Sequence, residues 1–171
     1  MATTYRICPR SGLQFDTAAE QLMRWNAVAG VLALLLGGIM ALGVILTRWP
    51  AVHLLPADQF YLALTSHGVN MLVFWIIFFE MAVLYFASST LLHCRLATPK
   101  IAWAGFWLMA IGAIMTNVAI FQGESSVMFT SYVPMQAAPH FYLGIILVAV
   151  GALLGTGVFF GTLVVAKKDK T

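Results

Sequence analysis

The residue of this chain best suited to chemistry is His67, an imidazole set inside a long apolar segment. It follows Thr65 and Ser66 and precedes Gly68, with apolar residues beyond them on both sides. Burying an unpaired imidazole in hydrocarbon is costly, so a histidine at this depth calls for a partner. Neutral imidazole is the commonest protein ligand of heme iron, so a heme site is one hypothesis. A histidine that hydrogen-bonds a neighbouring helix is the other.

Helical spacing predicts which residues share a face with His67. Three, four and seven residues further on stand Asn70, Met71 and Phe74. We expect them to form a small polar group followed by flat apolar walls, as the edge of a porphyrin requires. Gly68 lacks a side chain, and we expect this absence to let a macrocycle come close to the ligand.

Two more polar side chains, Glu80 and Asn117, stand within apolar runs. Carboxylates in the membrane mark proton paths or pair with a cation. Glu80 follows His67 by thirteen residues, which is about 20 Å along a helix and about 140° around it, so it faces away from His67. We therefore expect a structural or interfacial role for Glu80, and an interhelical hydrogen bond for Asn117.

His140 begins the last apolar run at a depth similar to that of His67. Two histidines on neighbouring helices can hold one heme between two imidazoles, so a small four-helix cytochrome b with His67 and His140 as ligands is an alternative. The other interpretation is an interfacial residue beside Pro139. His53 and His93 lie in predicted loops, where we expect them to be solvated.

Composition places the chain in a membrane. Its 171 residues are 61% hydrophobic and 9% charged, whereas an average soluble domain has about 25% charged residues. The pI near 9.1 does not indicate a nucleic-acid partner, because the basic residues stand beside apolar runs and membrane topology explains them. Cys8 and Cys94 are too few and too far apart for a disulfide framework or a metal cage.

Four apolar runs are long enough to cross the bilayer, since a crossing needs about 20 residues. They cover approximately residues 27–46, 61–92, 101–121 and 141–166. Only helices satisfy their own backbone hydrogen bonds in a lipid-exposed segment of this kind. The sequence therefore predicts one all-α domain over residues 1–171, an integral membrane four-helix bundle surrounded by lipid.

Lysine and arginine predict the orientation of that bundle. The two loops on one side hold Arg48 alone. The opposite side holds the remaining basic residues: Arg6, Arg10, Arg24, Arg95, Lys100, Lys167, Lys168 and Lys170. By the positive-inside rule both termini are cytoplasmic, in a multi-pass protein of the plasma or inner membrane. His67 then lies about one to two turns inside the outer surface.

Glycines in the last run predict a packing surface. Gly151 and Gly155, and then Gly157 and Gly161, are separated by three residues, a spacing that lets helix backbones approach closely. We expect this surface, together with the His67 face, to meet another membrane protein.

Two stretches resemble a known family. Residues 57–69, Ala-Asp-Gln-Phe-Tyr-Leu-Ala-Leu-Thr-Ser-His-Gly-Val, resemble the start of transmembrane helix two in subunit I of heme-copper oxidases. Residues 124–135, followed by Phe-Tyr-Leu-Gly at 141–144, resemble the outer loop of the B-type branch, where T-x-Y-P-P-L precedes F-Y-L-G. Val133 replaces the first proline of that pattern, and Met135 replaces its leucine. The resemblance spans roughly residues 27–165.

The resemblance implies that His67 is an axial ligand of a low-spin heme, which passes electrons to an oxygen-reducing centre. The catalytic subunit of this family has many more helices than the four expected here. The second ligand of the low-spin heme, the ligand of the second heme and the copper-ligating histidines are missing, so no catalytic residue is assigned.

We therefore expect the N-terminal part of a split subunit I, not catalytic alone, with copper and the second heme on a partner chain. That chain would carry the remaining subunit I helices, beside other oxidase subunits. The ending Lys167-Lys168-Asp169-Lys170-Thr171 fits a cytoplasmic stop. A shortened or degenerate relative, or a heme-less membrane scaffold, is the alternative.

Overall fold

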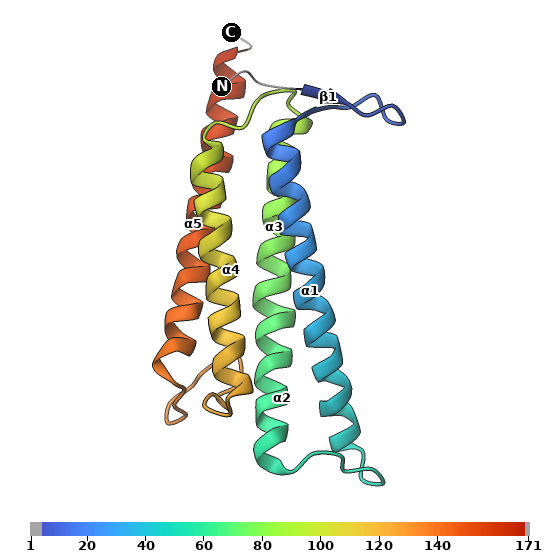
Figure 1. The fold of residues 1–171 in the computed structure, drawn as a ribbon, viewed down its shortest axis with the longest axis vertical. Coiled ribbons are helices and arrows are strands. Elements are labelled where there is room, and N and C mark those ends of the chain that lie inside the picture. The colour runs from blue at the N-terminus through green and yellow to red at the C-terminus, as the bar shows by residue number, and fades with distance from the viewer. Residues whose placement is uncertain (1–4, 170–171) are drawn as a thin grey trace.

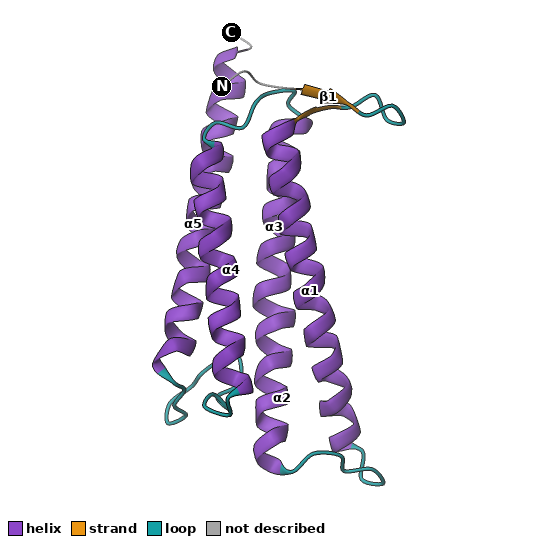
Figure 2. Cartoon of the chain, in the orientation of Figure 1, coloured by secondary structure: helices purple, strands orange, loops and turns teal. Residues whose placement is uncertain are grey.

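The computed structural model describes residues 5–169, and within them the four apolar runs form four long helical rods (Figures 1 and 2). The second rod is continuous from Ala57 to Thr90 and contains two π-helical turns. The elements are α1 Thr17–Arg48, α2 Ala57–Val69, η1 Asn70–Phe74, α3 Trp75–Tyr85, η2 Phe86–Thr90, α4 Pro99–Phe121 and α5 Pro139–Asp169. The prediction of an all-α membrane bundle is confirmed. Lys170 and Thr171 lie outside the described residues.

Three of the rods are longer than the bilayer requires. α1 has 32 residues, or about 48 Å at about 1.5 Å per residue, whereas the hydrocarbon core is about 30 Å thick. It begins at Thr17, well before the apolar run at residues 27–46, because the polar stretch around Glu20 continues the same helix. The sequence therefore predicted the membrane-crossing parts, and the helices extend beyond them.

The N-terminal segment forms a hairpin that the sequence did not predict. Strand β1 (Tyr5–Ile7) pairs antiparallel with β2 (Gln14–Asp16), and the hairpin projects sideways from the end of α1 (Figure 1). Arg6 fixes it to the helix through two bonds to the carboxylate of Glu20, at 2.9 and 2.6 Å. The hairpin and the C-terminal end of α5 lie at the same end of the bundle (Figure 1).

The helices pack as two close pairs, α1 against the α2–α3 rod and α4 against α5. Glycines at the contact between α4 and α5 allow the backbones of these two helices to approach each other closely. A Cβ atom on Gly112 would collide with the carbonyl oxygen of Gly144, and one on Gly151 would lie 2.5 Å from the carbonyl oxygen of Gly105. Because the obstacles are backbone atoms, neither position admits a side chain without moving a helix.

The prediction that these glycines form a surface for a partner protein is therefore wrong for Gly151 and Gly155. Gly151 and Gly155 are buried inside the bundle, where Gly151 packs on α4 and Gly155 faces Met81 of α3. Gly157 is exposed and has no atom within 4 Å of its Cβ position. The two glycine pairs lie on different faces of α5. Gly157 follows Gly151 by six residues, and at about 100° per residue this places the two glycines about 120° apart around the helix axis.

Candidate functional site

His67 lies in the last turn of α2 and is half-buried. Its Nδ1 atom is 2.9 Å from the carbonyl oxygen of Gly37 on α1. A carbonyl only accepts hydrogen bonds, so Nδ1 carries the proton and donates it. Within the described part of the chain, Nε2 has no hydrogen-bond partner. The imidazole is thus held in the tautomer whose free nitrogen can coordinate a metal.

Glycine on α1 allows this bond to form. A Cβ atom at Gly37 would lie 2.6 Å from Cγ and 3.0 Å from Sδ of Met71, so α1 approaches α2 closely only because Gly37 has no side chain. The next residue, Gly38, has nothing within 4 Å of its Cβ position. Gly37 therefore serves the histidine, and no signal in the sequence distinguishes it from the other glycines of the first run.

The expected apolar slot beside His67 is not formed by the residues that helical spacing predicted. Asn70 and Phe74 are 1% and 0% exposed, so both point into the bundle. Met71 packs against Gly37. η1 begins at Asn70, so the rotation of about 100° that its extra residue causes applies to Phe74 and the residues after it. Asn70 and Met71 keep their helical spacing from His67, and both lie close to Gly37.

Asn70 is the partner in the interhelical hydrogen bond that was predicted for Asn117. Its Nδ2 donates to Oδ1 of Asn117 at 2.8 Å, and Nδ2 of Asn117 donates back to Oδ1 of Asn70 at 3.2 Å. Asn70 Nδ2 also donates to the carbonyl oxygen of Ser66 at 2.8 Å. The prediction for Asn117 is confirmed, and this amide pair ties the His67 rod to α4.

Gly68 serves a different neighbour from the one expected. A Cβ atom there would lie 3.0 Å from Cβ and Cδ1 of Phe129, a residue of the loop between α4 and α5. The backbone N–H of Met128 in the same loop donates to Oγ1 of Thr65 at 2.8 Å. The absence of a side chain at Gly68 therefore makes room for Phe129 of this loop. Phe129 occupies the space beside Gly68 that was expected to admit a macrocycle.

His140 and His67 turn toward different parts of the molecule. Nε2 of His140 lies 3.2 Å from Oε1 of Gln122, at the junction of α4 and α5, whereas His67 faces α1. His53 and His93 are exposed in loops, as predicted. The structure thus does not pair His67 with a second imidazole among the described residues, and that part of the chain holds no group of three potential metal ligands.

Glu80 is exposed on the outer side of α3. Within residues 5–169 its carboxylate has no hydrogen bond or ion pair. The angle about the helix axis between Glu80 and His67 is about 140° for a regular α-helix. The extra residue of η1 changes this angle to about 120°, which is still large. The prediction that it faces away from His67 therefore agrees with the structure.

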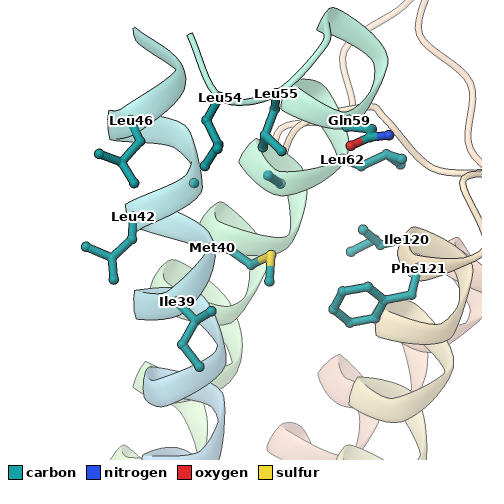
Figure 3. Close-up of a pocket in the computed structure, with 12 residues that line it drawn as sticks. Ile39, Met40, Leu42, Leu46, Leu54, Leu55, Gln59, Leu62, Ile120 and Phe121 are labelled. Carbon is teal, nitrogen blue, oxygen red and sulfur yellow. The ribbon is translucent and has the colours of Figure 1, made fainter. Parts of the chain in front are cut away.

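A hollow of about 480 Å³ lies between the C-terminal half of α1, the start of α2 and the end of α4 (Figure 3). Its walls are apolar, with Gln59 as the polar exception, and include Met40, Leu62 and Phe121. His67 does not line it. This hollow is therefore separate from the imidazole.

Comparison with known proteins decides the family. Residues 21–171 match the profile of the family described as cytochrome c and quinol oxidase polypeptide I. The chain belongs to this family. A solved heme-copper terminal oxidase dimer has a similar fold, with a TM-score of 0.70 at 25% identity, over 81% of this chain and 24% of that one.

Two curated relatives agree with the subunit I assignment. Cytochrome c oxidase subunit 1 of Thermus thermophilus is 29% identical over 93 residues, which are 54% of this chain and 16% of the relative. Probable cytochrome c oxidase subunit 1-beta of Nocardia farcinica is 25% identical over 143 residues, 75% of this chain and 22% of the relative. The chain thus spans about a fifth of the length of the relatives it matches.

The family implies heme and copper, and the two groups fit this chain unequally. His67 fits a heme, because its Nδ1–H is bonded and its Nε2 is left for iron. Copper in such a centre needs several clustered nitrogen ligands, and the described residues provide no cluster of that kind. Among the described residues, the geometry at His67 is therefore compatible with a heme ligand, and no cluster suited to copper is present.

Proposed function

We propose that this chain carries one axial ligand of the low-spin heme in a heme-copper terminal oxidase, and that the ligand is Nε2 of His67. The observation that carries the proposal is the 2.9 Å bond between Nδ1 of His67 and the carbonyl oxygen of Gly37. Histidines that bind metals characteristically donate their other ring N–H to an acceptor of this kind.

Each residue around His67 has a positioning role in this proposal. The Gly37 carbonyl fixes the tautomer and the ring plane and makes Nε2 a stronger ligand. The Asn70–Asn117 pair holds the rod that carries His67 against α4. A bound heme would supply reversible one-electron transfer toward the oxygen-reducing centre.

The rest of the redox site lies outside these 171 residues in this proposal. The second axial ligand, the second heme and the copper are assigned to a partner chain with the remaining subunit I helices. Support comes from the matched share of the relatives, 16% and 22%, and from the Nε2 atom of His67, which has no partner among the described residues. The 130–135 loop motif supports the B-type branch.

The orientation is also proposed from charge. Basic residues gather at the end of the bundle that holds the hairpin and the last turn of α5, whereas Arg48 stands at the other end. We place the first end in the cytoplasm and the protein in the plasma or inner membrane. His67 then lies in the outer half of the bilayer.

The test is the pyridine-hemochrome and low-spin absorption spectrum of the purified complex and of the chain alone. His67→Ala is expected to abolish the low-spin signal, because no other imidazole among the described residues is placed to bind the iron in its stead. His53→Ala and His140→Ala, which remove an exposed imidazole and one bonded to Gln122, are the controls and should retain it. An undiminished low-spin signal in His67→Ala refutes the proposal. If the chain alone binds a full complement of heme, and His140→Ala abolishes that binding, the result favours a small cytochrome b with His67 and His140 as ligands.

A further inference from the structure

Two hollows on the outer surface of the bundle meet at the same two residues. The first lies at the hairpin end of α1 and is lined by Gln21, Arg24, Trp25 and Val28. The second is a groove between α1 and α4, and Trp25 and Val28 line it as well. A polar, cationic depression thus continues directly into an apolar groove that runs toward the middle of the membrane.

The polar depression is positively charged. Arg24 is exposed and makes no ion pair among the residues that the structure describes. The acidic group that attracts it is Glu20, whose carboxylate is already bonded twice to Arg6. Beside the guanidinium stand the amide of Gln21 and the indole of Trp25, two further donors suited to a phosphate or glycerol oxygen.

The groove has the length and surface of a lipid chain site. Its wall on α1 runs from Trp25 to Leu36, about 17 Å at about 1.5 Å per residue, and one leaflet of hydrocarbon is about 15 Å thick. Its volume is about 510 Å³. Small side chains on both helices leave this space unfilled: Ala29, Ala33, Ala110 and Ala113.

The polar groups at the far end of the groove are already hydrogen-bonded. Asn70 and Asn117 line it there, but their amides bond each other, so they offer little to a polar ligand. The rings of Trp25 and Phe106, with centroids 6.4 Å apart, stand near its entrance. The one strong polar attraction is therefore at the Arg24 end, and everything beyond it favours hydrocarbon.

We propose that this surface binds one anionic phospholipid, with its phosphate at Arg24 and one acyl chain in the groove between α1 and α4. Charge complementarity at one end and a leaflet-length apolar channel at the other select a phospholipid over a transmembrane helix, which would not place an anion at Arg24. The site is distinct from His67, which does not line the groove.

The experiment places the full chain, with any co-purifying subunits, in nanodiscs of phosphatidylcholine containing a minor share of phosphatidylglycerol. Native mass spectrometry then counts the lipids that stay bound. Arg24→Gln is expected to lower the retention of phosphatidylglycerol relative to phosphatidylcholine about fivefold, and Arg24→Lys to preserve it. Arg95→Gln removes the same charge from an exposed loop residue at the same end and should behave as wild type.

A second pair of variants tests the groove. Ala110→Leu fills it and should release both lipids, whereas Ala104→Leu adds the same atoms to an exposed position outside it and should not. Circular dichroism confirms that each variant is folded. Equal retention of the two lipids by wild type, an Arg95→Gln effect equal to that of Arg24→Gln, or undisturbed retention in Ala110→Leu overturns the proposal. Loss of a co-purifying subunit in Ala110→Leu, with no lipid bound in wild type, shows a protein in the groove instead.

Discussion

Replacing Gly37 by leucine tests whether the α1 carbonyl positions His67. A Cβ atom there would already lie 2.6 Å from Cγ of Met71 and 3.3 Å from Cβ of Asn70, and leucine brings three further atoms into the same space. Met71 can swing aside, but the rod cannot, so α1 must move outward. The 2.9 Å bond between Nδ1 of His67 and the Gly37 oxygen is then stretched or broken.

This geometry sets the size of two effects. Overpacking of a close contact costs about 1–3 kcal/mol of stability. Loss of the partner of a metal-binding histidine weakens metal affinity by about 10- to 100-fold. We therefore expect Gly37→Leu to assemble but to lose its low-spin heme at an about 10- to 100-fold lower concentration of a competing heme scavenger such as apomyoglobin.

Gly38→Leu is the matched control. It introduces the same side chain one residue later on the same helix, where nothing lies within 4 Å of the Cβ position. Heme retention by Gly38→Leu should equal that of wild type. If Gly37→Leu assembles and holds its heme as tightly as Gly38→Leu, the Gly37 carbonyl does not position the ligand.

Three further predictions concern packing, thiol reactivity and Glu80. Gly151→Ala should lower the stability of the chain in a detergent-unfolding titration by about 1–3 kcal/mol, whereas Gly157→Ala should leave it equal or up to about 1 kcal/mol higher, because only the first added methyl group meets backbone. Equal stabilities would contradict the α4–α5 packing. Hydrogen bonds from Ser11 lower the pKa of the Cys8 thiol to about 7, so its alkylation rate should rise with pH and level off above about pH 8, while buried Cys94 stays unlabelled in the folded protein. In intact cells, labelling of Cys8 by a membrane-impermeant maleimide would contradict a cytoplasmic N-terminus. Glu80→Gln should keep more than about half of oxidase turnover, since the carboxylate faces away from His67, and a large loss at unchanged heme content would show a proton-transfer role.

The sequence by itself determined the four membrane helices and the identity of the one candidate ligand. Each apolar run must become a helix, because in hydrocarbon the backbone can be satisfied only within its own segment. That requirement is local, so it is readable from residues 27–46 or 101–121 alone. The pairing of Asn117 across helices was readable for the same reason, since an amide in lipid needs a partner.

Only the tertiary structure decided which faces of these helices are used. Asn70, expected beside a heme, bonds Asn117 instead, and Met71 fills the space beside Gly37. Gly68 contacts Phe129 of the loop between α4 and α5. Gly151 and Gly157 look alike in the sequence, yet one touches the backbone of Gly105 and the other faces outward. The reason is that hydropathy fixes whether a segment enters the membrane, whereas its neighbours are set by helices distant in the chain. In lipid, every face of an apolar helix is equally soluble, so close packing and hydrogen bonds alone choose among them.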